Sequence, residues 1–513
     1  MTLTLIDFFC GAGGSSTGAA AVPGVVPLLA ANHWDKAIAS HAANHPAAEH
    51  FIGDLHDADV ARFPAADLFW ASPECPKWSN ARGKRRDFDR QPDLFGETLP
   101  DAATDRSRAL MWDVPRYLES AAARGRPVAA GVVENVVDVR AWHDWERWVG
   151  DIRALGYTTK LVALNSMHVR PEHTDPCPQS RDRLYLAYWR TALGRRPDWD
   201  KWLRPAAWCP GCEHPVKAVQ VFKKRGGDMG RYRQQYVYRC PNVACRNMVV
   251  EPAALPAATA IDWTRQGTAI GARPRELSPK TLDRIRAGLA RYGTPVLTPA
   301  GGTWRTEASS VGEPMPTRTT RENDALAVPP LLVPVEGRDG KQAAPATDPW
   351  RTQTARNETG LAWLPFIAEL RGGNSDARPV LDALATVTAS GNHHGLVTAP
   401  TPPASGWANL LVPYYSTGAA RPAADPIGTL TTRDRYALAS GAAATGLDEV
   451  LFRMLEPDEI GRAMAFADTY TVLGNKREKV RQYGNAVTPP AAEVLISALT
   501  ETVTGTDLPR TAA

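Results

Sequence analysis

A single cysteine at the end of an apolar run is the residue whose placement points most directly to chemistry. Cys75 follows residues 66–70 in a loop bounded by Pro73 and Pro76. Open α/β sheets place their reacting groups at the carboxyl ends of such strands, and a deprotonated thiol is a strong nucleophile. A lone cysteine can equally be a small buried hydrophobic residue. Residues elsewhere in the chain must therefore decide between a nucleophile and a core side chain.

A glycine-rich turn near the N-terminus has the pattern of a nucleoside-binding loop. Residues 10–16 follow one apolar strand pattern and open a helical one, so their glycines allow a tight turn and close approach of the backbone to a ligand. Such turns serve NAD, FAD, nucleotides and S-adenosylmethionine alike. The ends of the next two apolar runs add Trp34, a plane for an adenine, and the carboxylates Asp35 and Asp54 for ribose hydroxyls. Taken singly, each is also an ordinary loop residue.

Acidic and basic side chains stand at the ends of two further apolar runs. Glu134 ends the run 128–134, where burial would raise its pKa and suit it to donate a proton. Arg181 and Arg183 enter the run 183–189 at a spacing of two, which places them on one face of a strand. The alternative interpretation of Glu134 is a helix cap. A surface salt bridge would explain one of the two arginines. Two arginines directed at one site indicate binding of an anion or a base.

The elements that must position these residues alternate along the first part of the chain. Short apolar runs at 3–9, 25–31, 66–71, 128–134, 159–165 and 183–189 are separated by helical stretches, which predicts a doubly wound, mostly parallel α/β sheet. At 513 residues the chain exceeds the roughly 250 to 300 residues of a single core. We expect a catalytic domain at 1–190, an insertion at 191–445, a return to the catalytic domain at 446–503 and a tail at 504–513.

Composition excludes several classes of protein. The chain is 43% hydrophobic and 22% charged, has no apolar window of about 18 residues, and begins without a basic signal region. This predicts a globular protein of the cytoplasm with no membrane partner. Its seven cysteines are then expected to serve catalysis or metal binding rather than disulfides. The net charge of +4 is too small to identify a partner.

The insertion contains a repeat. Similar phrases begin at residues 313, 348, 382 and 425, and an apolar segment ending in proline precedes several of them. Each unit resembles two short strands joined by a turn, so the units at about 295–440 are expected to stack into a β-rich array. The array is either a scaffold or, because each loop offers an arginine or asparagine, a nucleic-acid surface.

Four cysteines in the insertion have the spacing of a metal site. Cys209 and Cys212 form one close pair, Cys240 and Cys245 form a second one, and 27 residues lie between the two pairs. Two such pairs match tetrahedral thiolate coordination of a structural Zn²⁺ in a ribbon at about 205–250. Four unrelated thiols are the alternative.

The segment between the two cysteine pairs is strongly basic. A hairpin is expected around Gly226 and Gly227, with aromatic residues interleaved among its charges. This composition is typical of a DNA-contacting finger, and a solvated basic face is the alternative. The predicted DNA contacts are Lys223, Lys224, Arg225, Arg231 and Arg233.

The order of these motifs resembles that of the cytosine-C5 DNA methyltransferase family. The glycine loop, the Pro-x-Cys loop, Glu-Asn-Val at 134–136, Gln-x-Arg-x-Arg at 179–183, the long insertion and a Gly-Asn turn at 484–485 follow one another as in that family, over residues 3–190 and 450–500. The resemblance implies a Rossmann-like methyltransferase sheet that binds S-adenosylmethionine and carries a β-rich, zinc-containing target-recognition insertion. It makes Cys75 the nucleophile that adds to C6 of a flipped-out cytosine, Glu134 the donor to N3, and Arg181 and Arg183 the groups that hold the base.

The same resemblance supplies a cofactor site and partners. The residues it assigns to S-adenosylmethionine are Phe8, Phe9, Gly11, Ala12, Gly13, Gly14, Trp34, Asp35, Asp54, Leu55, Pro73, Asn485 and Val487. It places Arg82, Lys84, Arg85 and Arg86 on a loop that grips DNA phosphates, for which a solvated charge run is the alternative. The implied partner is double-stranded DNA, a cognate restriction endonuclease is possible, and a monomer is expected.

Three departures from the family pattern indicate a divergent member. Glu74 and Pro76 flank the nucleophile, His33 stands where the family usually carries a ribose-binding glutamate, and residues 170–177 are extra. RNA as the substrate, a non-catalytic DNA-binding protein on the same scaffold, and transfer of another one-carbon group therefore stay open.

Overall fold

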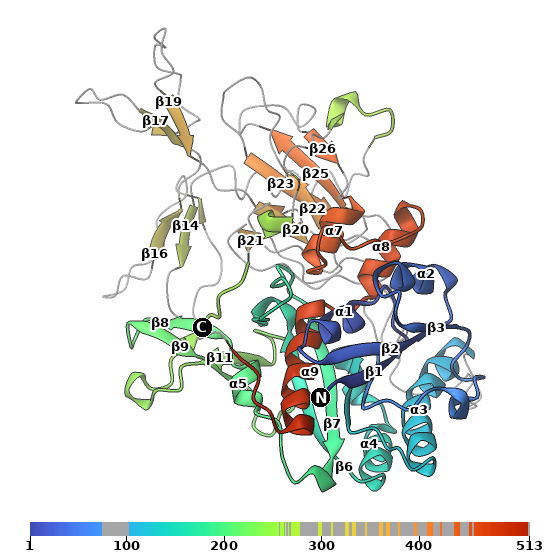
Figure 1. The fold of residues 1–513 in the computed structure, drawn as a ribbon. Coiled ribbons are helices and arrows are strands. Elements are labelled where there is room, and N and C mark those ends of the chain that lie inside the picture. Colours follow the sequence, from blue (N-terminus) through green and yellow to red (C-terminus); the bar gives the residue numbers. More distant parts are fainter. Residues whose placement is uncertain are drawn as a thin grey trace, which may run out of the picture.

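The fold is built on a seven-stranded sheet that helices cover on both faces (Figure 1). The computed structural model describes residues 1–73, 102–255, 257–260, 262, 265, 268–276 and 456–510, and between 296 and 453 it describes the strands alone. The sheet has the order β3-β2-β1-β4-β5-β7-β6. Its strands are β1 (Leu3–Phe8), β2 (Val25–Asn32), β3 (Glu49–Ile52), β4 (Leu68–Ala71), β5 (Ala130–Asn135), β6 (Tyr157–Asn165) and β7 (Asp182–Arg190).

Neighbouring strands from β3 to β5 are parallel, and β7 runs antiparallel to both β5 and β6. The predicted mostly parallel α/β sheet is therefore confirmed, because each apolar run has become a strand within one or two residues of its expected bounds. Since β1, β2, β4 and β5 are parallel, the loops that follow them leave the sheet at one edge. That edge brings together the glycine loop, Trp34, Pro73 and Glu134.

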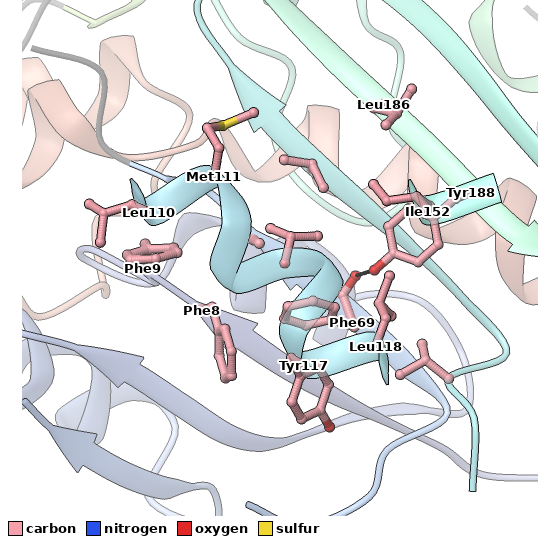
Figure 2. Packing of buried hydrophobic residues seen from close by; sticks show 14 of the residues in the cluster. Phe8, Phe9, Phe69, Leu110, Met111, Tyr117, Leu118, Ile152, Leu186 and Tyr188 are labelled. Atoms are coloured by element: carbon pink, nitrogen blue, oxygen red, sulfur yellow. Dashed lines mark hydrogen bonds between the residues drawn. The ribbon is translucent and has the colours of Figure 1, made fainter. Parts of the chain in front are cut away.

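Alternating side chains of the strands enter two cores. Phe8 and Phe69 pack among α3 (Ala102–Ala123) and α4 (Trp145–Ala154) on one face, as Figure 2 shows. Leu5 and Trp70 point to the other face, against α9 (Pro489–Thr504). The remaining helices are α1 (Gly14–Ala20), α2 (Asp35–Asn44), α5 (Trp199–Leu203), α7 (Pro457–Ala463) and α8 (Lys476–Asn485).

The C-terminal helix α9 lies directly against α1, although nearly 470 residues separate them. A Cβ on Gly18 would overlap the backbone oxygen of Pro489 and lie 2.7 Å from the Cβ of Ala492. The buried carboxylate of Glu493 accepts backbone N–H groups of Glu172, His173 and Thr174 at 2.7 to 2.9 Å. Residues 170–177 are thus a loop bound to α9.

We expect Gly18→Ala to destabilise the protein, because the added methyl group cannot fit between α1 and α9. Overpacking of this kind costs about 1 to 3 kcal/mol. Gly150→Ala in α4 is the matched control, since a Cβ there meets nothing within 4 Å and alanine favours a helix by up to about 1 kcal/mol. Urea unfolding followed by tryptophan fluorescence would compare them. Equal unfolding midpoints for Gly18→Ala and wild type would contradict the close helix packing.

The first part of the insertion forms two small sheets. β8 (Ala206–Cys209) pairs with β9 (His214–Lys217), and β10 (Val219–Phe222) pairs with β11 (Tyr236–Arg239), which also pairs with β12 (Val249–Val250). The antiparallel β10–β11 pair confirms the hairpin expected around Gly226 and Gly227.

In the part of 296–441 that the structure describes, each repeat has three strands. The first and third strands of every unit pair antiparallel, and a two-residue strand lies between them in sequence. The units are β14 (Val296–Pro299), β15 (Ser309–Ser310) and β16 (Asp324–Ala327); β17 (Leu331–Pro334), β18 (Ala344–Pro345) and β19 (Thr359–Ala362); β20 (Phe366–Glu369), β21 (Arg378–Pro379) and β22 (His394–Val397); and β23 (Ala408–Pro413), β24 (Arg421–Pro422) and β25 (Tyr436–Gly441).

The expected single array is only partly formed. The last two units share one eight-stranded sheet with β13 (Thr268–Ala269) and β26 (Leu451–Arg453), whereas the first two form separate three-stranded sheets. Because β13 pairs with β26, the segments that precede and follow the repeats lie in the same sheet.

Candidate active site

The loop after β1 is shaped by a buried carboxylate that the sequence analysis did not single out. Asp7 accepts the hydroxyls of Ser15 at 2.6 Å and Ser16 at 2.7 Å, so it fixes the first turn of α1 relative to the strand. Burial raises the pKa of Asp7 to about 7, and the two serine hydroxyls oppose that shift. Phe9 at φ 59° and Gly11 at φ 55° are left-handed, which turns the chain sharply here.

The glycines of this loop have different roles. A Cβ on Gly11 would meet nothing within 4 Å, so this position is open to a ligand. A Cβ on Gly13 would lie 2.5 Å from the Tyr470 hydroxyl, and one on Gly14 would overlap the backbone oxygen of Val487. The last two glycines are therefore required by close approach of protein neighbours, and a sequence interpretation that reserves them all for a ligand is incomplete.

Several residues expected at the cofactor are core residues. Phe8 is fully buried against Phe69, and Leu55 and Val487 are also buried. Ala12 is buried as well, and its carbonyl accepts the Tyr470 hydroxyl. The side chains of these residues support the loops of the site from the core, and any contact with a ligand would come from their backbone.

Trp34 precedes α2 at the end of β2 and is half-buried. Its backbone N–H donates to Asn32 Oδ1 at 2.9 Å, and the guanidinium of Arg481 lies 4.4 Å from its ring centroid. Asp35 is exposed in the first turn of α2, and the neighbouring His33 is exposed too. An aromatic ring and a carboxylate thus follow β2, the strand next to β1, and such a pair suits the base and the sugar of a nucleoside.

The loop that carries Asp54 is held by residues of α3. Asp54 accepts the His56 N–H at 3.1 Å. The buried Asp113 contacts His56 Nδ1 and Arg116, each at 3.2 Å, and Arg116 donates to the Leu55 carbonyl. Burial raises the pKa of Asp113, and its neighbours Arg116 and His56 oppose the shift. No sequence motif marks Asp113 and Arg116, because only the fold brings α3 against this loop.

The catalytic candidates Glu134 and Arg183 form a buried ion pair. Arg183 Nε lies 3.0 Å from Glu134 Oε1, and the two side chains are 11% and 10% exposed. Glu134 is on β5 and Arg183 on the adjacent β7, where Glu134 is paired with Tyr185. A guanidinium held against a carboxylate at a strand end can orient that carboxylate toward a base.

The described part of the Cys75 loop ends beside this pair. The Ser72 N–H donates to Phe8 O at 3.0 Å, and the Pro73 carbonyl accepts Asn135 Nδ2 at 3.4 Å. Pro73, two residues before Cys75, thus contacts the residue that follows Glu134. Cys75 itself and the basic residues Arg82, Lys84, Arg85 and Arg86 lie outside the described residues.

Arg181 contacts the turn that follows α8. Its guanidinium donates to the carbonyls of Gly484 at 3.4 Å and Ala486 at 2.8 Å, and its side chain is buried. Burial lowers the pKa of Arg181 to about 9, with Arg183 adding to the shift. Asn485 between these carbonyls is exposed. These bonds join two segments of the site that lie about 300 residues apart in sequence.

Comparison with protein families decides the kind of protein to which this site belongs. The family model for C-5 cytosine-specific DNA methylases matches residues 3–197 and 406–501, which is more than half of the chain. The chain belongs to the C-5 cytosine-specific DNA methylase family. This confirms the resemblance drawn from the order of the motifs.

Solved structures similar to this methylase are distant in sequence. They include Entamoeba histolytica methyltransferase EhMeth, at 10% identity, with 98% of each chain covered and a TM-score of 0.45. A mutant of Spodoptera frugiperda DNMT2 has 11% identity, coverage of 98% and 100%, and a TM-score of 0.45. A putative prophage-encoded DNA modification methyltransferase of E. coli has 12% identity, coverage of 98% and 99%, and a TM-score of 0.41. Likeness at this level carries no argument about substrate.

No curated protein matches the methylase chain. Within the described ranges, every helix is too short or too polar to span a bilayer.

The four cysteines of the insertion converge in this methylase. The Sγ atoms of Cys209, Cys212, Cys240 and Cys245 all lie within 4.8 Å of one another. The Cys209–Cys245 and Cys212–Cys240 sulfur distances are both 3.8 Å. A tetrahedral Zn²⁺ with Zn–S bonds of about 2.3 Å separates its sulfurs by about 3.8 Å. The donor set and its geometry therefore fit a structural metal.

The residues around the cluster also suit thiolate ligands. Asn242 donates its backbone N–H to Cys240 Sγ at 3.4 Å and its side-chain amide to Cys212 Sγ at 3.3 Å. Glu213, Arg246 and Asn247, which follow the two pairs, have φ between 50° and 56°. Such left-handed residues turn the chain tightly around both pairs.

The basic hairpin of this methylase is only partly available for DNA. Arg231 forms an ion pair with Asp138, and Arg233 forms one with Glu251 at 3.0 Å. Lys223 donates to the Arg233 carbonyl at 2.6 Å. Lys224 and Arg225 are exposed at the turn of the hairpin.

The aromatic residues of the hairpin are not a stacking surface. Tyr232, Tyr236 and Tyr238 are between 0% and 8% exposed and belong to a core with Ala163 and Met167 of the catalytic part. The expectation of an interleaved basic and aromatic contact surface is therefore wrong for the tyrosines. The alternation of Tyr236 and Tyr238 along β11 does not indicate which residues of the catalytic part cover them.

Proposed function

We propose that this methylase transfers a methyl group from S-adenosylmethionine to C5 of a cytosine in double-stranded DNA, through a covalent adduct between Cys75 and C6. The observation that carries the proposal is the buried Glu134–Arg183 pair beside Asn135 and Pro73, two residues before Cys75. The family match supports cytosine methylation. That the substrate is DNA rather than RNA is proposed in addition.

The chemistry assigns each residue a step. Addition of the Cys75 thiolate to C6 makes C5 an enamine carbon, which can attack an electrophilic methyl group. Arg183 contacts Glu134 Oε1, and we place N3 of cytosine at Oε2. The carboxylate takes up a proton from solvent as the cytosine enters, and passing this proton to N3 offsets the charge that develops on the ring. Removal of the C5 proton and elimination of the thiolate then release the product. Because C6 is shielded in a duplex, the cytosine must leave the base stack.

The cofactor proposal rests on the edge of the sheet. S-adenosylmethionine, when bound, supplies the activated methyl group. Gly11 has no side chain, so the protein backbone there would lie close to the cofactor. Trp34 would stack on the adenine, and Asp35 or Asp54 would accept hydrogen bonds from the ribose hydroxyls. Because His33 replaces the acidic residue of the family pattern, Asp35 is the candidate for the ribose contact.

The insertion at 191–445 is proposed as the target-recognition region. We assign a structural Zn²⁺ to its four converging cysteines, and phosphate contacts to the exposed Lys224 and Arg225 at the hairpin turn. The same role is proposed for Arg82, Lys84, Arg85 and Arg86 on sequence grounds.

Incubation with methyl-labelled S-adenosylmethionine and either duplex DNA or RNA tests the substrate. We expect label in duplex DNA and a nucleoside whose mass exceeds that of deoxycytidine by one CH2 unit, because the methyl group replaces the C5 hydrogen. Incorporation into RNA alone would favour an RNA methyltransferase. Clean DNA binding without transfer would favour a non-catalytic protein, and a different mass increment would show another one-carbon group.

A further inference from the structure

The cysteine-rich ribbon, residues 206–250, is bound to the catalytic part at the start of β7. Asp182 accepts the backbone N–H of Tyr232 at 3.0 Å, and its Oδ1 lies 3.4 Å from the Tyr236 hydroxyl. Burial raises the pKa of Asp182 to about 6, while the Tyr232 N–H and Arg231 oppose the shift. Asp182 directly precedes Arg183, the partner of Glu134.

Two ion pairs attach the ribbon to the segment that follows Glu134. Arg231 contacts Asp138, whose side chain is 9% exposed. Arg140 contacts Asp228 at 2.9 Å. Asp138 and Arg140 belong to a short 3-10 helix, Val137–Ala141, which begins three residues after Glu134.

A small shared core completes the interface. The ring of His168 lies with its centroid 4.4 Å from that of Tyr232 and 5.1 Å from that of Tyr238, in edge-on contacts. Gln220 of β10 donates to the Ala163 carbonyl of β6 at 2.9 Å. The ribbon is thus fixed to β6, to the beginning of β7 and to the segment after β5.

The ribbon contacts the chain close to each member of the Glu134–Arg183 ion pair. The strand carrying Arg183 begins at Asp182, and the strand carrying Glu134 leads into Asp138, so both chain segments are held by the same ribbon loop at 228–236. We propose that the ribbon is a positioning element for the Glu134–Arg183 pair and that Asp182 is the positioning residue through which it acts. The inference deepens the proposed function and rests on it for its catalytic consequence.

The metal site bears on this positioning role because the metal would stabilise the folded ribbon. A small ribbon with four converging thiols depends on its metal for structure. Loss of the metal would release Tyr232 and Tyr236 and leave the Asp182 carboxylate without those donors. The start of β7, and with it Arg183, would then be less restrained.

Asp182→Ala and Asp182→Asn test the positioning role. The alanine variant removes the acceptor, and we expect kcat for methyl transfer to fall about tenfold to a hundredfold with little change in the KM for DNA. The asparagine variant keeps an oxygen acceptor and is expected to recover most of the rate. Lys217→Ala, an exposed change on β9, is the control within the ribbon. A rise in the KM for DNA with unchanged kcat would overturn the proposal.

A second measurement does not depend on activity. Hydrogen exchange of the full protein, followed by mass spectrometry, is expected to be faster in peptides covering 130–136 and 182–190 for Asp182→Ala, for the milder Tyr236→Phe, and after removal of zinc by a chelator. Unchanged exchange there, with faster exchange confined to 206–250, would overturn the coupling. If wild type transfers no methyl group, the proposed function fails, and the exchange experiment still decides whether the ribbon restrains these strands.

Discussion

Cys75→Ser is expected to abolish methyl transfer, with a loss of about 10⁴-fold or more, because a serine hydroxyl is not ionised near neutral pH and cannot add to C6. The described chain reaches Pro73, whose carbonyl is bound by Asn135 beside Glu134. Binding of S-adenosylmethionine should be retained, since the candidates for its nucleoside, Gly11, Trp34, Asp35 and Asp54, follow β1, β2 and β3.

The measurement is covalent trapping on duplex DNA that contains 5-fluorocytosine. Fluorine at C5 cannot leave as the proton does, so the adduct persists and migrates as a protein–DNA complex in a denaturing gel. Cys177→Ser is the matched control, because this buried thiol donates to the Ala463 carbonyl at 3.3 Å and a serine can keep that bond. We expect trapping in wild type and in the control. An adduct formed by Cys75→Ser would rule Cys75 out as the nucleophile.

Glu134→Gln is expected to lower kcat by about 10²- to 10⁴-fold, the usual contribution of a positioned general acid. Glutamine keeps the size of the side chain but cannot take up a proton and pass it to N3, and it replaces the charged oxygen that Arg183 Nε contacts at 3.0 Å. The KM for S-adenosylmethionine should change little, since the effect falls on the base.

Single-turnover methyl transfer separates this effect from binding. Glu146→Gln is the matched control: Glu146 also contacts an arginine, Arg140 at 3.2 Å, but its side chain is 71% exposed. We expect the control to keep nearly the wild-type rate. Equal rates for Glu134→Gln and wild type would remove Glu134 from the mechanism.

Much of the site can be predicted from the sequence. The apolar runs are long enough to be identified as strands, and parallel strands bring their carboxyl ends to one edge, so the glycine loop, Trp34, Pro73 and Glu134 could be predicted to converge. The convergence of the four cysteines can also be predicted from the sequence, because metal ligation requires a donor type and a spacing that are local in sequence.

Other features depend on which distant segments meet. Gly13 and Gly14 look like ligand glycines, yet their missing side chains admit Tyr470 and Val487. Asp113 carries no motif, and its position under the Asp54 loop follows only from the packing of α3.

The sequence alone determined the α/β class, the family and the candidate groups for catalysis, because these follow from short-range periodicity and from the order of motifs. Only the tertiary structure decided that Arg231 pairs with Asp138, that the hairpin tyrosines are buried, and that Asp182 links the ribbon to Arg183. The physical reason is that burial and ion pairing are properties of a residue's spatial neighbours, and here those neighbours lie 50 residues or more away along the chain.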